Sequence, residues 1–133
     1  MEALGSKYPI LIISHLNCEL VCCHLDGYRG NREALLGRLH EIEAAFASKP
    51  VSEVHRVWYN LDDNQLDSPA LEAVTRSVAG MRLHIHMIAF VGLRGLTRRR
   101  FDKLLERALS GNALPRAYFS DAEQAKTWLV RHA

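Results

Sequence analysis

The sequence lacks the features that mark nucleotide-binding, nucleic-acid-binding or multidomain proteins. It contains neither a P-loop nor a GxGxxG motif, so no nucleotide site is predicted. Its 17 Lys and Arg residues are nearly balanced by 15 Asp and Glu, and a formal charge of +2 does not indicate nucleic-acid binding by the whole chain. No low-complexity tract or internal repeat divides the 133 residues, of which 48% are hydrophobic. We therefore expect one globular domain.

Cysteine is scarce and poorly spaced for metal or redox chemistry. Cys18, Cys22 and Cys23 are an odd number without a CxxC pair or a second ligand cluster. Cys18 and Cys22 lie an even number of residues apart, so on a strand they would share a face. We expect small, reduced, buried thiols in a cytoplasmic protein, and we predict no cofactor.

Long apolar runs are also missing. The N-terminal run at 8–14 is too short to span a bilayer, and no small-residue cleavage site accompanies it. We expect residues 1–7 to be a flexible N-terminus and residues 8–133 to form the single domain. Neither a signal peptide nor a membrane span is predicted.

What the sequence does contain is an alternation of strand and helix patterns. Residues 85–91, IHMIAFV, are a near-continuous apolar run that stops at Gly92, as in a parallel strand covered on both faces. Gly95 follows, and a basic amphipathic helix over 97–109 is predicted after it. Its expected buried face carries Phe101, Leu104, Leu105 and Ala108.

The same patterns predict the rest of the fold. Two strands at 8–14 and 18–25 are close enough in sequence only for a hairpin, and further strands are expected at 54–61 and 115–119. Helix N-caps are predicted at Asn31, at Ser68 before Pro69, and at Ser120 or Asp121. The first helix would bury Leu35, Leu39, Ile42 and Phe46. The order β-β-α-β-α-β-α-β-α predicts an α/β protein with a five-stranded, mostly parallel mixed sheet and four helices.

Three segments in this order carry a family resemblance. They are 57–62, the run Ala-Phe-Val-Gly-Leu-x-Gly-Leu at 89–96, and the helix bearing Asp121, Ala125, Trp128 and Leu129. From about Ile10 onward the chain resembles the STAS domain superfamily, in its SpoIIAA-like (STAS/SEC14-type) branch. That superfamily includes bacterial anti-sigma-factor antagonists and the tails of anion transporters. The resemblance implies a STAS-like fold and a regulatory, partner-binding role.

The resemblance also implies a regulatory serine. In signalling members a serine at the start of the second helix is phosphorylated to control binding of a kinase, and Ser68 occupies that place. Those members usually carry glycine after the serine, whereas this chain has Pro69. From the residues alone, Ser68 is either a helix cap or a phosphoswitch. A phosphate there would be favoured by the helix N-terminus but would repel the nearby acids, and this repulsion could release a partner. The predicted partner-binding loop comprises Asn60, Asp62, Asp63, Asp67 and Ser68.

A second candidate site follows the strand at 85–91. The segment containing Gly92, Arg94, Gly95 and Arg98 is either a tight strand-to-helix turn or a cradle in which backbone amides hold an anion. The basic face of helix 97–109 is either solvated or docks on an acidic surface. No aromatic residues are interleaved with it, so nucleic acid is not predicted.

Histidines and carboxylates complete the candidates. His84 and His86 would share a strand face with His55 nearby, but they lie at the amino ends of their strands, opposite the edge where α/β sheets bind ligands. We predict no metal and no catalytic constellation. The leading hypothesis is a non-enzymatic domain that binds a protein partner. The alternative is a small-ligand module for an anionic metabolite or lipid headgroup, as the SEC14 comparison implies.

Overall fold

The computed structural model describes residues 9–50 and 52–131. The predicted flexible N-terminus and Tyr8 fall outside these ranges. Within them the chain forms five strands and four α-helices in the predicted order, with one short 3-10 turn, η1, before β4. The bounds are β1 Ile10–His15, β2 Cys18–His24, α1 Arg32–Ala47, β3 His55–Asn60, α2 Ser68–Gly80, η1 Arg82–His84, β4 Ile85–Val91, α3 Gly95–Leu109, β5 Arg116–Phe119 and α4 Ala122–Arg131.

The five strands form one mixed sheet in the order β1-β2-β3-β4-β5. β1 and β2 are antiparallel, and β2, β3, β4 and β5 pair in parallel. The hairpin is joined by Leu16 and Asn17, which both have positive φ. That backbone is the two-residue turn whose twist matches paired strands. The α/β class, the mixed sheet and the four helices are therefore confirmed.

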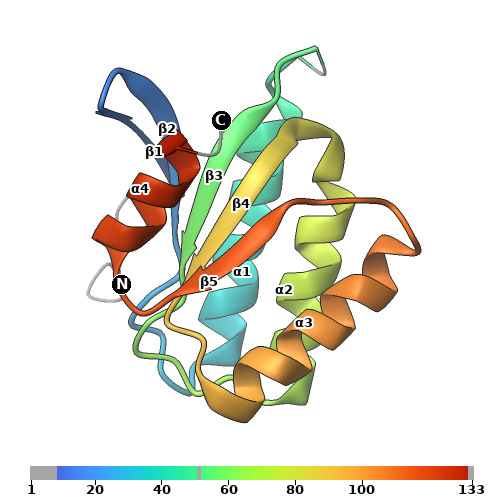
Figure 1. Ribbon diagram of the computed structural model, residues 1–133. Coiled ribbons are helices and arrows are strands. Elements are labelled where there is room, and N and C mark those ends of the chain that lie inside the picture. Colours follow the sequence, from blue (N-terminus) through green and yellow to red (C-terminus); the bar gives the residue numbers. More distant parts are fainter. Residues whose placement is uncertain (1–8, 51, 132–133) are drawn as a thin grey trace.

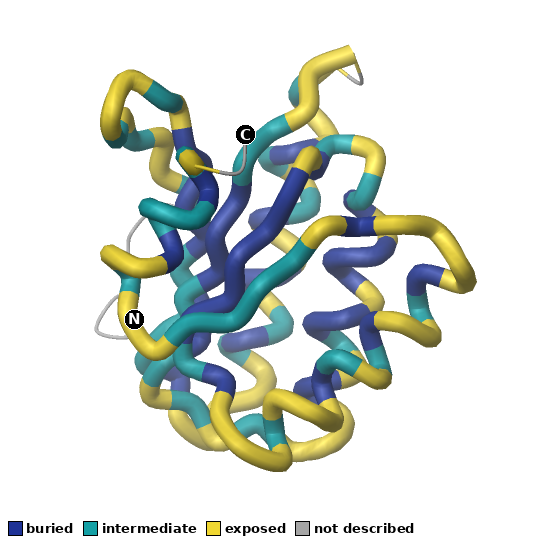
Figure 2. Tube along the Cα trace, viewed as in Figure 1, coloured by how far each residue is buried: buried dark blue, intermediate teal, exposed yellow. Residues whose placement is uncertain are grey.

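The helices cover the two faces of the sheet unequally. Helices α1, α2 and α3 lie on one face, and α4 crosses the other (Figure 1). The sheet has a hydrophobic core on each face, and alternate strand residues point into one or the other. Cys23, Tyr59 and Phe90 pack on the three-helix side, whereas Cys22 and Trp58 pack on the α4 side. The central strands are accordingly among the most buried parts of the molecule (Figure 2).

Side-chain N-caps precede α1 and α4. Asn31 accepts a hydrogen bond from the Ala34 backbone N–H at 3.1 Å, and Asp121 accepts one from Gln124 at 2.8 Å. Both side chains thereby satisfy amides that lack partners within the helix. The predicted stripe of α1 is fully buried. No described helix is long and apolar enough to cross a bilayer.

Candidate functional site

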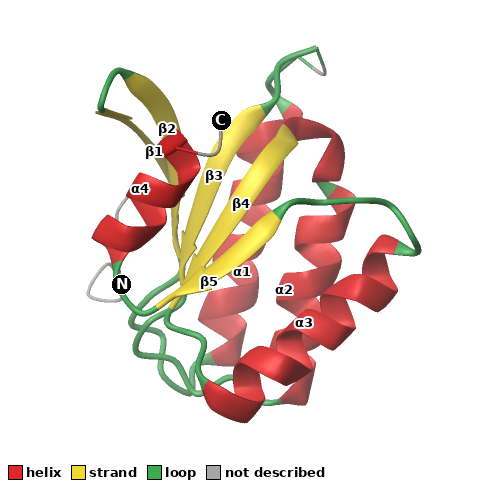
Figure 3. Cartoon of the chain, in the orientation of Figure 1, coloured by secondary structure: helices red, strands yellow, loops and turns green. Residues whose placement is uncertain are grey.

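The loops that follow β2, β3 and β4 gather at one edge of the sheet, because these three strands are parallel and their carboxyl ends lie together. Figure 3 shows them below the carboxyl ends of the strands. The Gly27 N–H donates to the Asp62 carbonyl at 3.0 Å, and the Leu61 N–H donates to the Val91 carbonyl at 2.8 Å. Backbone hydrogen bonds thus bind the three loops to one another beyond the end of the sheet.

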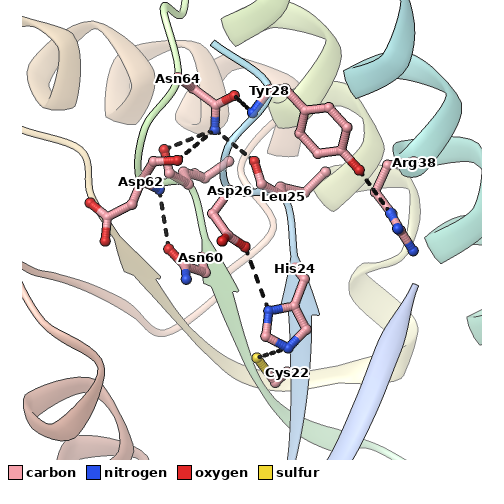
Figure 4. Close-up of polar contacts among 10 residues, drawn as sticks. Cys22, His24, Leu25, Asp26, Tyr28, Arg38, Asn60, Asp62 and Asn64 are labelled. Carbon is pink, nitrogen blue, oxygen red and sulfur yellow. Dashed lines mark hydrogen bonds and ion pairs between the residues drawn. The ribbon is translucent and has the colours of Figure 1, made fainter. Parts of the chain in front are cut away.

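Asn64 is the residue that connects these loops most extensively. Its side-chain nitrogen lies 2.6 Å from the Leu25 carbonyl oxygen, 3.0 Å from that of Leu61 and 3.1 Å from that of Asp62. Its side-chain oxygen accepts from the Tyr28 N–H at 3.2 Å (Figure 4). The Asn64 side-chain amide therefore provides hydrogen bonds to backbone groups of loops that have left the strand pairing of the sheet. The sequence pattern does not predict this role for Asn64, because an asparagine in a polar loop is an ordinary turn residue.

Gly92 lies directly against the Asp62 backbone. Its φ is +100°, and a Cβ built there would be 2.7 Å from the Asp62 nitrogen and 2.8 Å from a carboxylate oxygen of the same residue. This contact brings the two predicted sites, the 60–68 loop and the 92–98 turn, side by side. It also places a carboxylate beside the expected anion cradle, which disfavours an anion at Gly92 itself.

Two of the three acidic residues of the 60–68 loop pair with arginines that precede α1 or begin it. Asp63, at φ +57°, lies 3.3 Å from Arg29, and Asp67 lies 3.0 Å from Arg32. These four side chains are about half exposed or more, so each pair contributes little stability. The pairs do neutralise the acidic loop locally and connect it to α1. An open hollow of about 350 Å³ lies between the starts of α1 and α2 and is bordered by Arg29, Arg32 and Asp67.

The N-cap of α2 was predicted one residue too late. Asp67, in extended conformation, accepts from the Ala70 N–H at 3.0 Å, while Ser68 is the first helical residue. A carboxylate at Asp67 reaches the third amide of the helix, so the serine is not needed for capping. Ser68 is exposed and makes no hydrogen bond through its hydroxyl to another described residue.

The candidate anion residues at the start of α3 are separated. Arg94 is exposed and occupies the N-cap position without a capping side-chain bond. The Arg98 guanidinium instead lies 5.8 Å from the centre of the Tyr118 ring. Tyr118 and Arg116 both donate hydrogen bonds to Asp102, whose pKa is lowered mainly by the Arg116 bond. Arg98 therefore lies along β5, and Arg94 is the candidate arginine beside the backbone amides at the start of α3.

The histidine expectation is corrected in part. His84 belongs to η1 and does not share a β4 face with His86. His84 and His55 instead lie beside Phe46, with ring centroids 6.1 and 5.9 Å from its ring. Burial, followed by the charge of Lys49, lowers the pKa of His55. No group of three metal-ligating side chains occurs among the described residues.

Comparison with known proteins does not extend this description. No family model, no curated protein and no solved structure matches the chain. The class that the structure defines is an α/β domain with a polar loop surface at the carboxyl edge of its sheet.

Proposed function

We propose that the chain is a cytoplasmic, STAS-like regulatory domain that binds a protein partner through the loop surface at the carboxyl edge of the sheet. The loops there are joined by Asn64 and by backbone bonds, so a partner would meet a preformed surface. Leu96, 71% exposed, adds an apolar contact beside the polar loops. The chemistry required is recognition, without a catalytic step.

The observation that carries the proposal is the position of Ser68. Its hydroxyl is exposed at the first turn of α2, and Asp67 performs the capping. A phosphate at this position would gain from the amides and dipole of the helix N-terminus. It would also compete with Asp67 for Arg32, which lies 3.0 Å from that carboxylate. Phosphorylation would therefore change both the charge of the surface and its connection to α1.

The experiment compares affinity capture by four forms of the protein: wild type, Ser68→Ala, Ser68→Asp and Ser52→Asp. Ser52 is exposed in the loop before β3, at the opposite edge of the sheet, so its substitution adds the same charge away from the proposed surface. We expect one partner to be retained by wild type, Ser68→Ala and Ser52→Asp and lost from Ser68→Asp. Capture of the same proteins by all four forms, or no specific capture, would contradict the proposal. Circular dichroism confirms that each form is folded.

The alternative is an anionic metabolite or lipid headgroup at the start of α3. The feature that favours it is the exposed Arg94 beside helix amides that no side chain caps. Inorganic phosphate is the first probe, followed by vesicles containing anionic lipid. Binding would shift the amide resonances of Leu96 and Thr97, and Arg94→Ala would abolish the shift while Arg99→Ala would leave it. Unchanged spectra in the wild type would exclude this alternative.

A further inference from the structure

Three chemically complementary side chains lie in a row where β2 leaves the sheet. Cys22, His24 and Asp26 are spaced two residues apart, so extended backbone places them on the same side of the chain. Figure 4 shows the imidazole between the thiol and the carboxylate. The Cys22 Sγ lies 3.5 Å from His24 Nε2, and His24 Nδ1 lies 3.5 Å from an Asp26 oxygen. This is the order of nucleophile, base and orienting acid.

The electrostatics of the row favour a charged imidazole. The 3.5 Å ion-pair contact with Asp26, whose Oδ1 makes no well-aligned hydrogen bond to a described residue, and then the contact with Cys22 raise the pKa of His24 to about 10, against partial desolvation. The His24 contact in turn lowers the pKa of Asp26. A protonated ring at neutral pH presents a cation and a proton donor to the Cys22 sulfur, which lies 3.5 Å away.

The surroundings of the row add few competing charges. Leu11 and Trp58 flank Cys22 on the neighbouring strands, and Asn60 flanks His24. Arg38 acts on Asp26 from α1. From α4, Lys126 lies over the Trp58 ring and is bound to Glu123. The Trp58 indole N–H, buried in the same cluster as Cys22, has no hydrogen-bond partner among the described residues.

The other two cysteines provide internal comparisons. Cys23 points into the three-helix core, is fully buried, and has a pKa raised by that burial. Cys18, four residues before Cys22, is half-buried and lies 3.8 Å from Arg56. Cys22 is the thiol that contacts an imidazole, and it is 2% exposed beneath a His24 side chain that is 23% exposed. Only a small reagent would reach it.

We propose that Cys22 is a peroxide-reactive thiol, activated by His24 and Asp26, whose substrate class is hydrogen peroxide or a hydroperoxide of similar size. The thiolate attacks one peroxide oxygen, forming an S–O bond as the O–O bond breaks. The departing hydroxide takes the proton from His24 Nε2 and leaves as water. Sulfur is oxidised to a sulfenic acid and the peroxide is reduced. His24 is therefore both the counter-ion of the thiolate and the proton donor, and Asp26 is a positioning residue.

The sulfenic acid has no intramolecular thiol within reach. Four residues of strand separate Cys18 from Cys22 by about 13 Å, which is beyond disulfide distance. Cys23 faces the opposite side of the sheet. The product should therefore accumulate long enough to be trapped, and only an external thiol would reduce it.

The test exposes the reduced, full-length protein to hydrogen peroxide at pH 7 with dimedone present and measures adduct formation at each cysteine by mass spectrometry. We expect Cys22 to be labelled at least about tenfold faster than the buried Cys23, and faster than Cys18, because Arg56 beside Cys18 is a cation that does not give up a proton to the departing oxygen. Labelling of Cys18 first, or equal slow rates, would overturn the proposal.

His24→Gln and Asp26→Asn separate activation from packing. His24→Gln should slow labelling of Cys22 about tenfold at pH 7, and the rate should recover at pH 9.5, where solvent base supplies the thiolate. Asp26→Asn should slow it less. A rate in His24→Gln that equals that of the wild type at pH 7, or that does not recover with pH in a variant folded by circular dichroism, would exclude activation by the imidazole.

Discussion

At the scale of single residues, a few polar and glycine positions determine how the loop edge is built. Asn64 replaces backbone pairing among three carbonyls, and Gly92 allows the Asp62 backbone to approach closely. Neither role depends on a surface ion pair, since those at Asp63 and Asp67 are exposed and weak. The edge is therefore held mainly by partly buried hydrogen bonds and close backbone contact.

Gly92→Ala tests this close contact. The added methyl would lie 2.7 Å from the Asp62 nitrogen, and the φ of +100° would strain any other residue. We expect a loss of more than about 2 kcal/mol in the free energy of unfolding, measured with urea. Gly95→Ala is the matched control: its φ is also positive, at +55°, but nothing lies within 4 Å of the added methyl. It should cost about 1 kcal/mol. Equal losses would show that the Asp62 contact is unimportant.

The charged state of His24 predicts a pH-dependent stability. Its pKa is raised in the folded protein to about 10 from an ordinary 6.5. The contribution of the protonated ring is therefore complete below pH 6.5 and is lost as the pH rises through about 10. We expect the stability difference between wild type and His24→Gln to be larger at pH 6 than at pH 10 in urea unfolding of the reduced proteins. A difference independent of pH would contradict this assignment.

At the scale of elements, the start of α2 separates two roles that the sequence had assigned to one residue. Asp67 caps the helix and contacts Arg32 of α1, whereas Ser68 is an exposed helical residue. The elements α1 and α2 are thus connected at their amino ends as well as through their apolar stripes. A change at Asp67 should affect stability, and a change at Ser68 should affect the surface.

Asp67→Ala and Ser68→Ala form the corresponding pair of variants. Loss of the Asp67 cap should reduce the free energy of unfolding by about 1 kcal/mol. Ser68→Ala should change it by less than about 0.5 kcal/mol, because the hydroxyl is exposed and caps nothing. Thermal and urea unfolding measure both. A larger loss in the free energy of unfolding for Ser68→Ala than for Asp67→Ala would indicate that Ser68 is the cap.

At the scale of the whole molecule, the sheet has one thickly and one thinly covered face. Three helices cover one side, and α4 alone covers the other (Figure 1). Leu129 and Ala125 of α4 are fully buried against the strands. The stability of the α4 layer, and the burial of Cys22 within it, therefore depend on few side chains.

Leu129→Ala measures that dependence. Removing a fully buried leucine should lower the free energy of unfolding by about 3 kcal/mol. Leu96→Ala, at a leucine that is 71% exposed, should change it by less than about 0.5 kcal/mol. Chemical denaturation of both variants provides the comparison. A small loss at Leu129 would indicate that α4 detaches without affecting the rest of the domain.

Much of the fold could be predicted because the signals are local. The apolar run at 85–91 matches β4 at both ends, and the stripe from Leu35 to Phe46 is buried as its spacing requires. The gathering of the 60–68 and 92–98 loops followed from parallel strand order. The cap of α2 was missed by one residue because Asp67 and Ser68 are both good caps and only backbone geometry selects between them.

The sequence by itself determined the element order, the α/β class and the edge at which the loops meet, because hydrophobic period, turns and caps act over a few neighbouring residues. Only the tertiary structure decided which groups touch: Asn64 with the Leu25 carbonyl, Asp62 with Gly92, and Arg32 with Asp67. These contacts join residues about 30 to 40 positions apart. Even the row at Cys22, His24 and Asp26, whose spacing is visible in the sequence, required side-chain orientations to place the imidazole between thiol and carboxylate. Such orientations depend on packing from neighbouring strands, which no local pattern encodes.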